Sequence, residues 1–193
     1  MRVLVTYVSP HGSTRGIAQR IAKRLRESGL QVDCEPIHEI QGVDGYDAVV
    51  IGSAIHGRAW LTEASQFLST HADELVVRPV WLYSVGMPGA LARPLRRLAM
   101  REGPKAVAPF VEMVRPRDTR LFTGVVSKQQ FPTVSRAILR LMGAHYGDFR
   151  NWPDIDAWTA DISDCLLKGA PFGAVEVRSS TDNVPDRGVA LIA

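Results

Sequence analysis

The sequence predicts a single doubly wound α/β domain, in which an open parallel sheet of five strands carries helices on both faces. Short apolar runs rich in branched residues alternate along the chain with longer segments of helical periodicity. Strands that alternate with helices build parallel sheets with right-handed crossovers. The chain has 193 residues, of which 46% are apolar, and this length suffices to bury one two-sided core.

The first strand, loop and helix are the most clearly patterned part of the chain. Residues 3–8 form a nearly continuous apolar run, as expected of a central strand covered on both faces. A helix is predicted to begin near Arg15, because apolar residues then recur at helical spacing, at Ile17, Ala18, Ile21, Ala22 and Leu25. Gly29 stands where this helix is expected to end.

Four further strands are predicted, and helices lie between or after them. The strands are expected near residues 31–34, 48–51, 80–84 and 121–126, and helices at 63–71, 134–142 and 155–167. A basic, helical stretch from Arg93 to about Pro109 is interpreted as an insertion before or within the last strand. We therefore predict one domain over residues 1–168 and a tail over 169–193, which is mobile or packs as an extended arm.

Charge is distributed unevenly along the sequence. The net charge is +3, but eight basic residues and only three acidic ones lie between Arg93 and Arg120. A basic surface favours acidic partners, anionic lipid headgroups or carboxylate substrates, and the alternative is an ordinary solvated face. We expect no nucleic-acid partner, and the oligomeric state is left open.

The sequence also bears on location and on metal chemistry. It holds no apolar run of the roughly 18 residues that cross a bilayer, and the first strand begins at Arg2, which leaves no room for a signal peptide. We expect a cytoplasmic protein with peripheral contact at the inner face of the membrane through the basic stretch. Cys34 and Cys165 lie far apart without a CxxC pattern, which favours buried thiols over a disulfide or a metal site.

The loop after the first strand is the strongest candidate for binding a ligand, because open α/β sheets bind ligands beyond the carboxyl ends of their strands. Hydroxyls at Ser9, Ser13 and Thr14 precede a helix whose positive N-terminal end attracts an anion, and Gly12 allows a close backbone approach. The loop lacks the Lys of a nucleotide-triphosphate loop and the GxGxxG pattern of dinucleotide sites. It therefore predicts a cradle for a phosphate monoester, and the alternative is that a serine only caps the helix.

Ser9-Pro10-His11-Gly12-Ser13-Thr14 resembles the flavodoxin phosphate loop, written [ST]-x-T-G-x-T, and departs from it at His11, where Thr is usual. The loops after the third and fourth strands resemble those that flank the isoalloxazine ring in flavodoxins. The resemblance thus implies a flavodoxin-like fold and the cofactor flavin mononucleotide (FMN). The residues it implies for FMN binding are Ser9, His11, Gly12, Ser13, Thr14, Ser53, Ala54, Ile55, His56, Gly57, Ser84, Val85, Gly86 and Met87.

A narrower resemblance is to the flavodoxin-type menaquinone-dependent protoporphyrinogen IX dehydrogenases. It covers about residues 1–168 and is carried by YDAVVIGSAI from Tyr46, LYSVGM from Leu82, the basic insertion ending in Arg115-Pro116, the Gly124 strand and GDFRNW from Gly147. The resemblance implies an oxidoreductase in which the flavin is the reactive centre, so that no catalytic side chain is named. It implies a reduced electron donor, such as protoporphyrinogen IX, and a quinone acceptor.

Some residues beside these loops have two interpretations. Trp60 either stacks on the flavin or packs a helix, and packing is favoured. His56 or Arg58 either faces the N1 and O2 edge of the flavin or is merely exposed at the surface. Asp148 and Arg150 either close the far side of the site or form an ordinary ion pair, and the structural interpretation is favoured.

Three other functions are weighed against the oxidoreductase. A pure flavodoxin-type electron carrier is disfavoured by the basic insertion, because such carriers are usually acidic around the flavin. A response-regulator domain needs carboxylates after strands one and three, where the sequence has Ser9-Pro10-His11 and Gly52-Ser53. The one feature shared with that class is Lys128, just after the fifth strand. A degenerate fold without flavin, serving as an interaction module, stays open because of His11.

Overall fold

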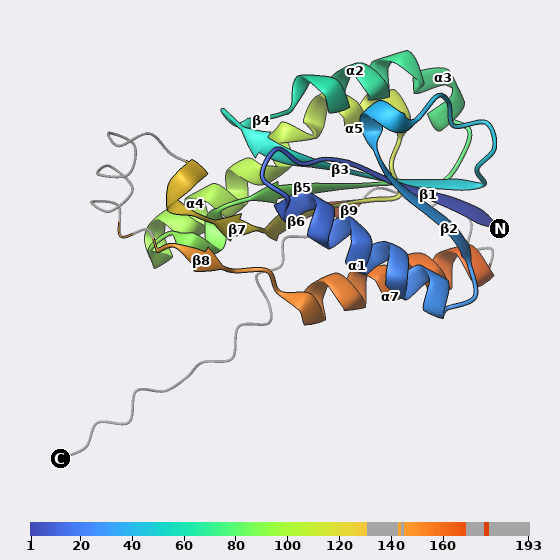
Figure 1. The fold of residues 1–193 in the computed structure, drawn as a ribbon. Helices are drawn as coiled ribbons and strands as arrows, with labels where there is room; N and C mark the ends of the chain where they lie inside the picture. Colours follow the sequence, from blue (N-terminus) through green and yellow to red (C-terminus); the bar gives the residue numbers. More distant parts are fainter. Residues whose placement is uncertain (131–142, 144, 169–175, 178–193) are drawn as a thin grey trace.

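The computed structural model describes residues 1–130, 143, 145–168 and 176–177, and its centre is a parallel sheet (Figure 1). Within that part of the chain the strands lie in the order β2-β1-β3-β5-β6-β9. Their bounds are β1 (Arg2–Val8), β2 (Gln31–Pro36), β3 (Ala48–His56), β5 (Val80–Gly86), β6 (Asp118–Thr123) and β9 (Glu176–Val177). The first five confirm the predicted parallel sheet, and the short β9 extends it beside β6.

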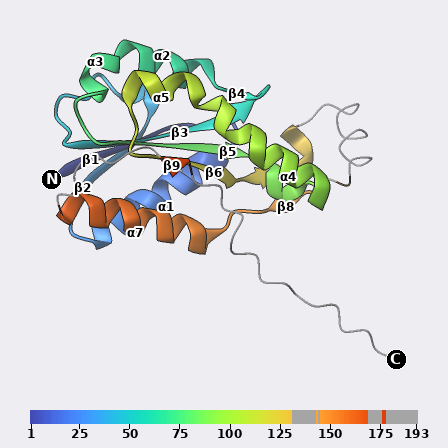
Figure 2. The same ribbon diagram turned by 180° about the vertical axis from the view of Figure 1, so that it is seen from behind.

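Helices cover both faces of this sheet, as the alternating pattern predicts (Figures 1 and 2). One face carries α1 (Ser13–Glu27) and α7 (Trp152–Lys168). The other face carries α2 (Thr62–Thr70), α3 (Ala72–Leu75) and α5 (Ala108–Val114). Strand side chains alternate between the two faces. Val5 therefore joins the core under α1 and α7, whereas Leu4 joins the core under the other helices.

Several predicted elements are longer than their sequence patterns. α1 begins at Ser13 and not near Arg15, β3 continues from Ile51 to His56, and α7 begins at Trp152. The basic stretch folds into α4 (Arg93–Glu102), a 3-10 turn at Gly103–Ala106 and the start of α5, and it lies before the last predicted strand. The helix predicted over 134–142, and all of the tail except β9, lie outside the described residues.

The strand predicted over residues 121–126 is wrong as a single element. β6 ends at Thr123, and Val125–Val126 form a separate strand, β7, which pairs antiparallel with β8 (Gly147–Asp148). The Gly124 N–H donates to the Gly86 carbonyl at 2.9 Å, whereas the Val125 N–H turns to the Ser13 hydroxyl at 2.9 Å. The chain thus leaves the main sheet at Gly124 to contact the start of α1.

The two cysteines differ from the prediction of buried thiols. Cys34 and Cys165 are both free, and each is only half-buried. The Cys165 sulfur accepts a hydrogen bond from Arg117, and burial raises the pKa of the Cys34 thiol to about 11. No cluster of His, Cys, Asp and Glu among the described residues has the makeup of a metal site.

Among the helices of the described residues, none is both long enough and apolar enough to cross a bilayer.

Candidate functional site

The three loops singled out by the sequence meet at the carboxyl edge of the sheet, on the left in Figure 1. β1 lies between β2 and β3, so the chain turns to opposite sides after β1 and after β3. Such a reversal in strand order leaves a crevice outside the strand ends, where ligands of doubly wound sheets bind. The topology thus places the candidate site beside the loop that follows β1.

The loop between β1 and α1 presents unpaired backbone donors. Gly12 caps the helix in the left-handed region at φ 80°, and its carbonyl accepts the first helical bond from the Gly16 N–H at 3.0 Å. The Arg15 N–H donates to the Ser9 hydroxyl at 3.1 Å, so Ser9 pairs with one amide of the first turn although Gly12 is the N-cap residue. Among the described residues, the N–H groups of residues 11–14 have no partner. Four such donors at a helix N-terminus suit an anion.

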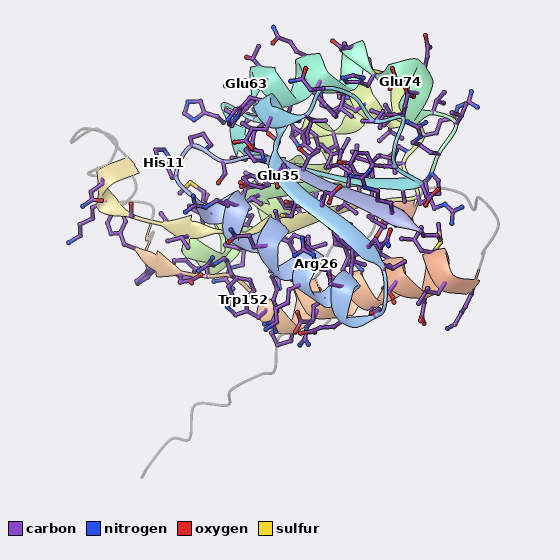
Figure 3. The ribbon with its side chains drawn as sticks, turned by 45° about the vertical axis from the view of Figure 1, so that its right-hand side comes forward. His11, Arg26, Glu35, Glu63, Glu74 and Trp152 are labelled. Carbon is purple, nitrogen blue, oxygen red and sulfur yellow. The ribbon has the colours of Figure 1, made fainter. Side chains whose placement is uncertain are left out.

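The polar side chains of this loop differ in their roles. The Ser13 hydroxyl accepts the Val125 N–H, so its own proton stays available for an anion. Thr14 is buried beneath the loop, at 1% exposure. His11 is exposed and lies at the carboxyl edge, above the start of α1 (Figure 3). The loop therefore offers one hydroxyl and several amides without a charged side chain of its own.

The loop after β3 is a tight hairpin. β4 (Ala59–Trp60) pairs antiparallel with the end of β3 through a two-residue turn, in which Gly57 and Arg58 have φ of 57° and 69°. The Ser53 hydroxyl accepts the Leu61 N–H at 3.2 Å and donates to the carbonyl of the next residue at 2.9 Å. Ser53 thus holds the base of the hairpin with its hydroxyl, while His56 and the turn are exposed.

Trp60 and Ser84 form a buried contact between the second and third loops. The Trp60 indole N–H donates to the Ser84 hydroxyl at 2.8 Å, and the ring packs on Phe110 with centroids 5.4 Å apart. Trp60 is 5% exposed and Ser84 1%. This geometry favours the packing interpretation of Trp60, and it directs the Ser84 hydroxyl into the core.

The loop after β5 is held by residues that the sequence analysis did not single out. Arg96 of α4 donates to the Gly89 carbonyl at 3.0 Å, and the Gly89 N–H donates to the Thr123 hydroxyl at 3.2 Å. Beside them, Met87 is half-buried and Val85 is buried. The Gly89–Thr123 contact joins positions 34 apart in the sequence, so no local pattern marks it.

Asp148 and Arg150 form the ion pair that the sequence analysis favoured. The guanidinium of Arg150 donates to both carboxylate oxygens of Asp148, at 2.8 and 2.5 Å, and its carbon lies 4.5 Å from the centre of the Trp152 ring. The hydrogen bonds from Arg150 lower the pKa of Asp148 below its ordinary value.

The structure therefore gathers the sequence-predicted residues at one edge but gives them unequal roles. The amides of residues 11–14 and the Ser13 hydroxyl have free hydrogen-bonding capacity. The Ser53 and Ser84 hydroxyls are engaged inside the protein. Contact between the cofactor and each individual residue stays a prediction.

An uncharged cradle of amides and a hydroxyl fits a phosphate monoester, which is the group that FMN would present to it. A parallel sheet in the order β2-β1-β3-β5-β6, with an anion cradle after its first strand, defines the class of flavodoxin-like α/β proteins. When bound, FMN supplies hydride or electron transfer, and the protein supplies position and electrostatics.

Comparison with known proteins supports the same class. Residues 4–150 match the flavodoxin domain family, so the chain belongs to this family of FMN-binding oxidoreductases, and its cofactor is FMN. Over 89 residues the chain is 34% identical to "Protoporphyrinogen IX dehydrogenase [quinone]" of Escherichia coli strain K12. This alignment covers 45% of the chain and 49% of the relative, so the chain spans about half the length of that relative.

Solved structures resemble the fold over most of the chain. A flavodoxin from Streptococcus pneumoniae TIGR4 is 16% identical, with a TM-score of 0.59 over 88% of this chain and 100% of the other. Rubredoxin oxygen:oxidoreductase from Desulfovibrio gigas is 14% identical, with a TM-score of 0.56 over 86% of this chain and 36% of the other. At such identities these structures support the fold alone.

Proposed function

We propose that this protein is an FMN-dependent dehydrogenase that passes electrons from a reduced donor, with protoporphyrinogen IX as the candidate, to a quinone. The observation that carries the proposal is the 34% identity over 89 residues to a relative named for this reaction. In each turnover the donor loses two electrons and two protons, and the quinone takes up the equivalent two electrons and two protons to become a quinol. Bound FMN would supply the electron transfer between the two, so the protein needs no nucleophile.

The proposed cofactor site uses the three loops at the carboxyl edge of the sheet. The amides of residues 11–14 and the Ser13 hydroxyl hold the phosphate, which the positive end of α1 also attracts. The backbones of residues 54–57 and 84–87 flank the ring, because the hydroxyls of Ser53 and Ser84 are already engaged. His11 stands where flavodoxins usually have a Thr hydroxyl donor, and its exposed imidazole weakens the binding of the phosphate without abolishing it.

We further propose a cytoplasmic location with peripheral contact between α4 and a membrane that contains anionic lipid. α4 lies near the carboxyl edge of the sheet, beside β7 and β8 (Figure 2). Arg97 is exposed on this helix, and Leu98 beside it is 57% exposed. A basic helix with an exposed apolar residue suits the interface of an anionic bilayer, where a quinone acceptor resides.

The reaction is tested with the full chain loaded with FMN and desalted under anaerobic conditions. Protoporphyrinogen IX and menaquinone are added together, and the fluorescence of protoporphyrin IX is followed against samples that lack protein, quinone or FMN. The proposal predicts fluorescence that depends on all three. An FMN-loaded protein that oxidises no donor in the presence of either menaquinone or ubiquinone contradicts it and favours the electron-carrier alternative, and a chain that retains no FMN favours the interaction module.

The membrane contact is tested separately by co-sedimentation with vesicles. Wild-type protein is expected to bind vesicles with about 30% phosphatidylglycerol and to bind neutral phosphatidylcholine vesicles much less, because each basic residue near an anionic surface contributes roughly 1 kcal/mol. Leu98→Glu and Arg97→Glu should each reduce binding severalfold, and Lys23→Glu, an exposed change on α1, should not. Equal binding to both kinds of vesicle contradicts the proposed contact.

A further inference from the structure

Arg150 is a cation close to the loop that the proposed function assigns to the FMN phosphate, although it belongs to the distant β8–α7 connection. Its side chain is only 19% exposed. The nearest heavy atom to the position where a Cβ on Gly16 would lie is the Arg150 Nη1, at 2.5 Å. The guanidinium therefore rests directly on the first turn of α1.

Gly16 fixes how far this cation lies from the cradle. Its N–H donates to the carbonyl of Gly12, the residue that caps the helix. One helical turn rises about 5.4 Å, so the guanidinium lies about one turn from the unpaired amides of residues 11–14. At such a distance a partly buried charge still acts appreciably on an anion.

The guanidinium is held in place on two sides and keeps one nitrogen available. Its Nε and Nη2 donate to the Asp148 carboxylate, and the Trp152 ring lies against its plane. Among the described residues Nη1 has no hydrogen-bond partner. Asp148 lies on β8, which pairs with β7, and the Val125 N–H of β7 donates to the Ser13 hydroxyl. The strand pair that carries Asp148 is therefore hydrogen-bonded to the phosphate cradle.

From this geometry we infer that Arg150 is a positioning residue for the cofactor, which strengthens binding of the FMN phosphate by placing a fixed positive charge over the first turn of α1. The inference rests on the proposed phosphate site. It gives the first turn of α1 a guanidinium whose Nη1 is available to an anion, while the Asp148 carboxylate offsets part of the positive charge. It also gives Gly16 a role, because any side chain there would displace the guanidinium.

The test compares two ligands that differ only in the phosphate, FMN and riboflavin, by quenching of flavin fluorescence on the full chain. Arg150→Gln should raise the Kd for FMN about fivefold at low salt and leave the Kd for riboflavin within about twofold. Arg150→Lys should recover most of the FMN affinity. The FMN effect should shrink at about 300 mM salt, because the charge is screened.

Arg20→Gln is the matched control, since Arg20 lies on the same helix face one turn further along, 5.9 Å from the Trp152 ring, and carries the same charge. It should change neither Kd by more than about twofold. Gly16→Ala keeps every charge but displaces the guanidinium, and it should weaken FMN binding about threefold without affecting riboflavin. This variant also replaces Gly by a better helix former, so it answers the question if Arg150→Gln does not fold.

Equal weakening of FMN and riboflavin by Arg150→Gln would assign Arg150 a purely structural role and overturn the inference, as would unchanged binding of both. Failure of the wild-type chain to bind FMN is a different result, because it refutes the proposed cofactor site itself. The two failures are therefore distinguishable in one titration series.

Discussion

Tyr83 of β5 lies across the backbone of Gly52 in the neighbouring strand β3. The ring is fully buried, and its hydroxyl has no hydrogen-bond partner among the described residues. Burial raises the pKa of Tyr83 well above its ordinary value, so the phenol stays neutral. The contact lets the Tyr83 ring pack over the backbone of β3 beneath the candidate site, and it depends on the missing side chain of Gly52.

Gly52→Ala is expected to destabilise the protein by about 3 kcal/mol, because the new Cβ would overlap the Tyr83 ring and neither group can move without disturbing the core. Urea unfolding measures the loss. Gly42→Ala is the control, since no atom lies within 4 Å of its new Cβ. Similar midpoints for the two variants would show that the strands separate easily, contrary to this argument.

Ser84→Ala should also lower stability, by about 1–3 kcal/mol, because the buried indole N–H of Trp60 loses its acceptor. The same change loosens the hairpin after β3, so Trp60 should become more accessible to an acrylamide quencher. Ser69→Ala removes an exposed hydroxyl from α2 and serves as the comparison. If both variants unfold at the same urea concentration, the Trp60 bond contributes nothing measurable.

At the scale of elements, α1 and α7 are joined by a partly exposed ion network. Asp156 of α7 accepts from Arg20 at 2.6 Å and from Arg24 at 2.7 Å. These hydrogen bonds hold the pKa of Asp156 far below its ordinary value of 3.8. The network fixes the two helices that cover one face of the sheet, and one of them, α1, begins at the proposed phosphate loop.

Asp156→Asn should lower the urea midpoint at pH 7, and the difference from wild type should shrink as the pH falls below about 4. A carboxylate with a depressed pKa stabilises the folded state fully above its unfolded pKa, near 3.8, and loses this contribution as pH falls through the lower folded value. Unfolding at pH 7, 5 and 3 measures the trend. Asp161→Asn, an exposed change on the same helix, is the control for removing a carboxylate, and a deficit of Asp156→Asn that is the same at pH 7 and pH 3 would contradict the linkage.

At the scale of the whole molecule, the site lies at one edge of a layered sandwich, and loops from many elements converge on it (Figure 1). Such loops are less stable than the cores beneath them. A ligand that contacts several of these loops at once binds only the folded state. Its binding therefore measures whether the loops at the carboxyl edge are correctly folded.

FMN at about 100 times its Kd should raise the free energy of unfolding by about 2.7 kcal/mol. For a domain of this length the corresponding rise in Tm is about 5–10 °C, and differential scanning calorimetry measures it. AMP, which carries a phosphate monoester but no isoalloxazine ring, should raise Tm far less at the same concentration. An unchanged Tm with FMN would contradict the assigned cofactor.

The sequence by itself determined the alternation of strands and helices, the five-stranded parallel sheet and the loop from Ser9 to Thr14. These features depend on patterns within about thirty residues, in which periodicity, Gly12 and Gly29 act locally. The helix predicted over 134–142 lies outside the described residues, and the ligand contacts of single loop residues remain predictions.

Only the tertiary structure decided which polar groups stay free and which are consumed inside the protein. The break at Gly124 follows from the bond between Val125 and Ser13, which are 112 positions apart in the sequence. The hydrogen bond from Trp60 to Ser84 and the contact of the Arg150 guanidinium with Gly16 likewise join distant segments. Such contacts depend on how the layers pack, so they cannot be predicted from a local pattern of residue types.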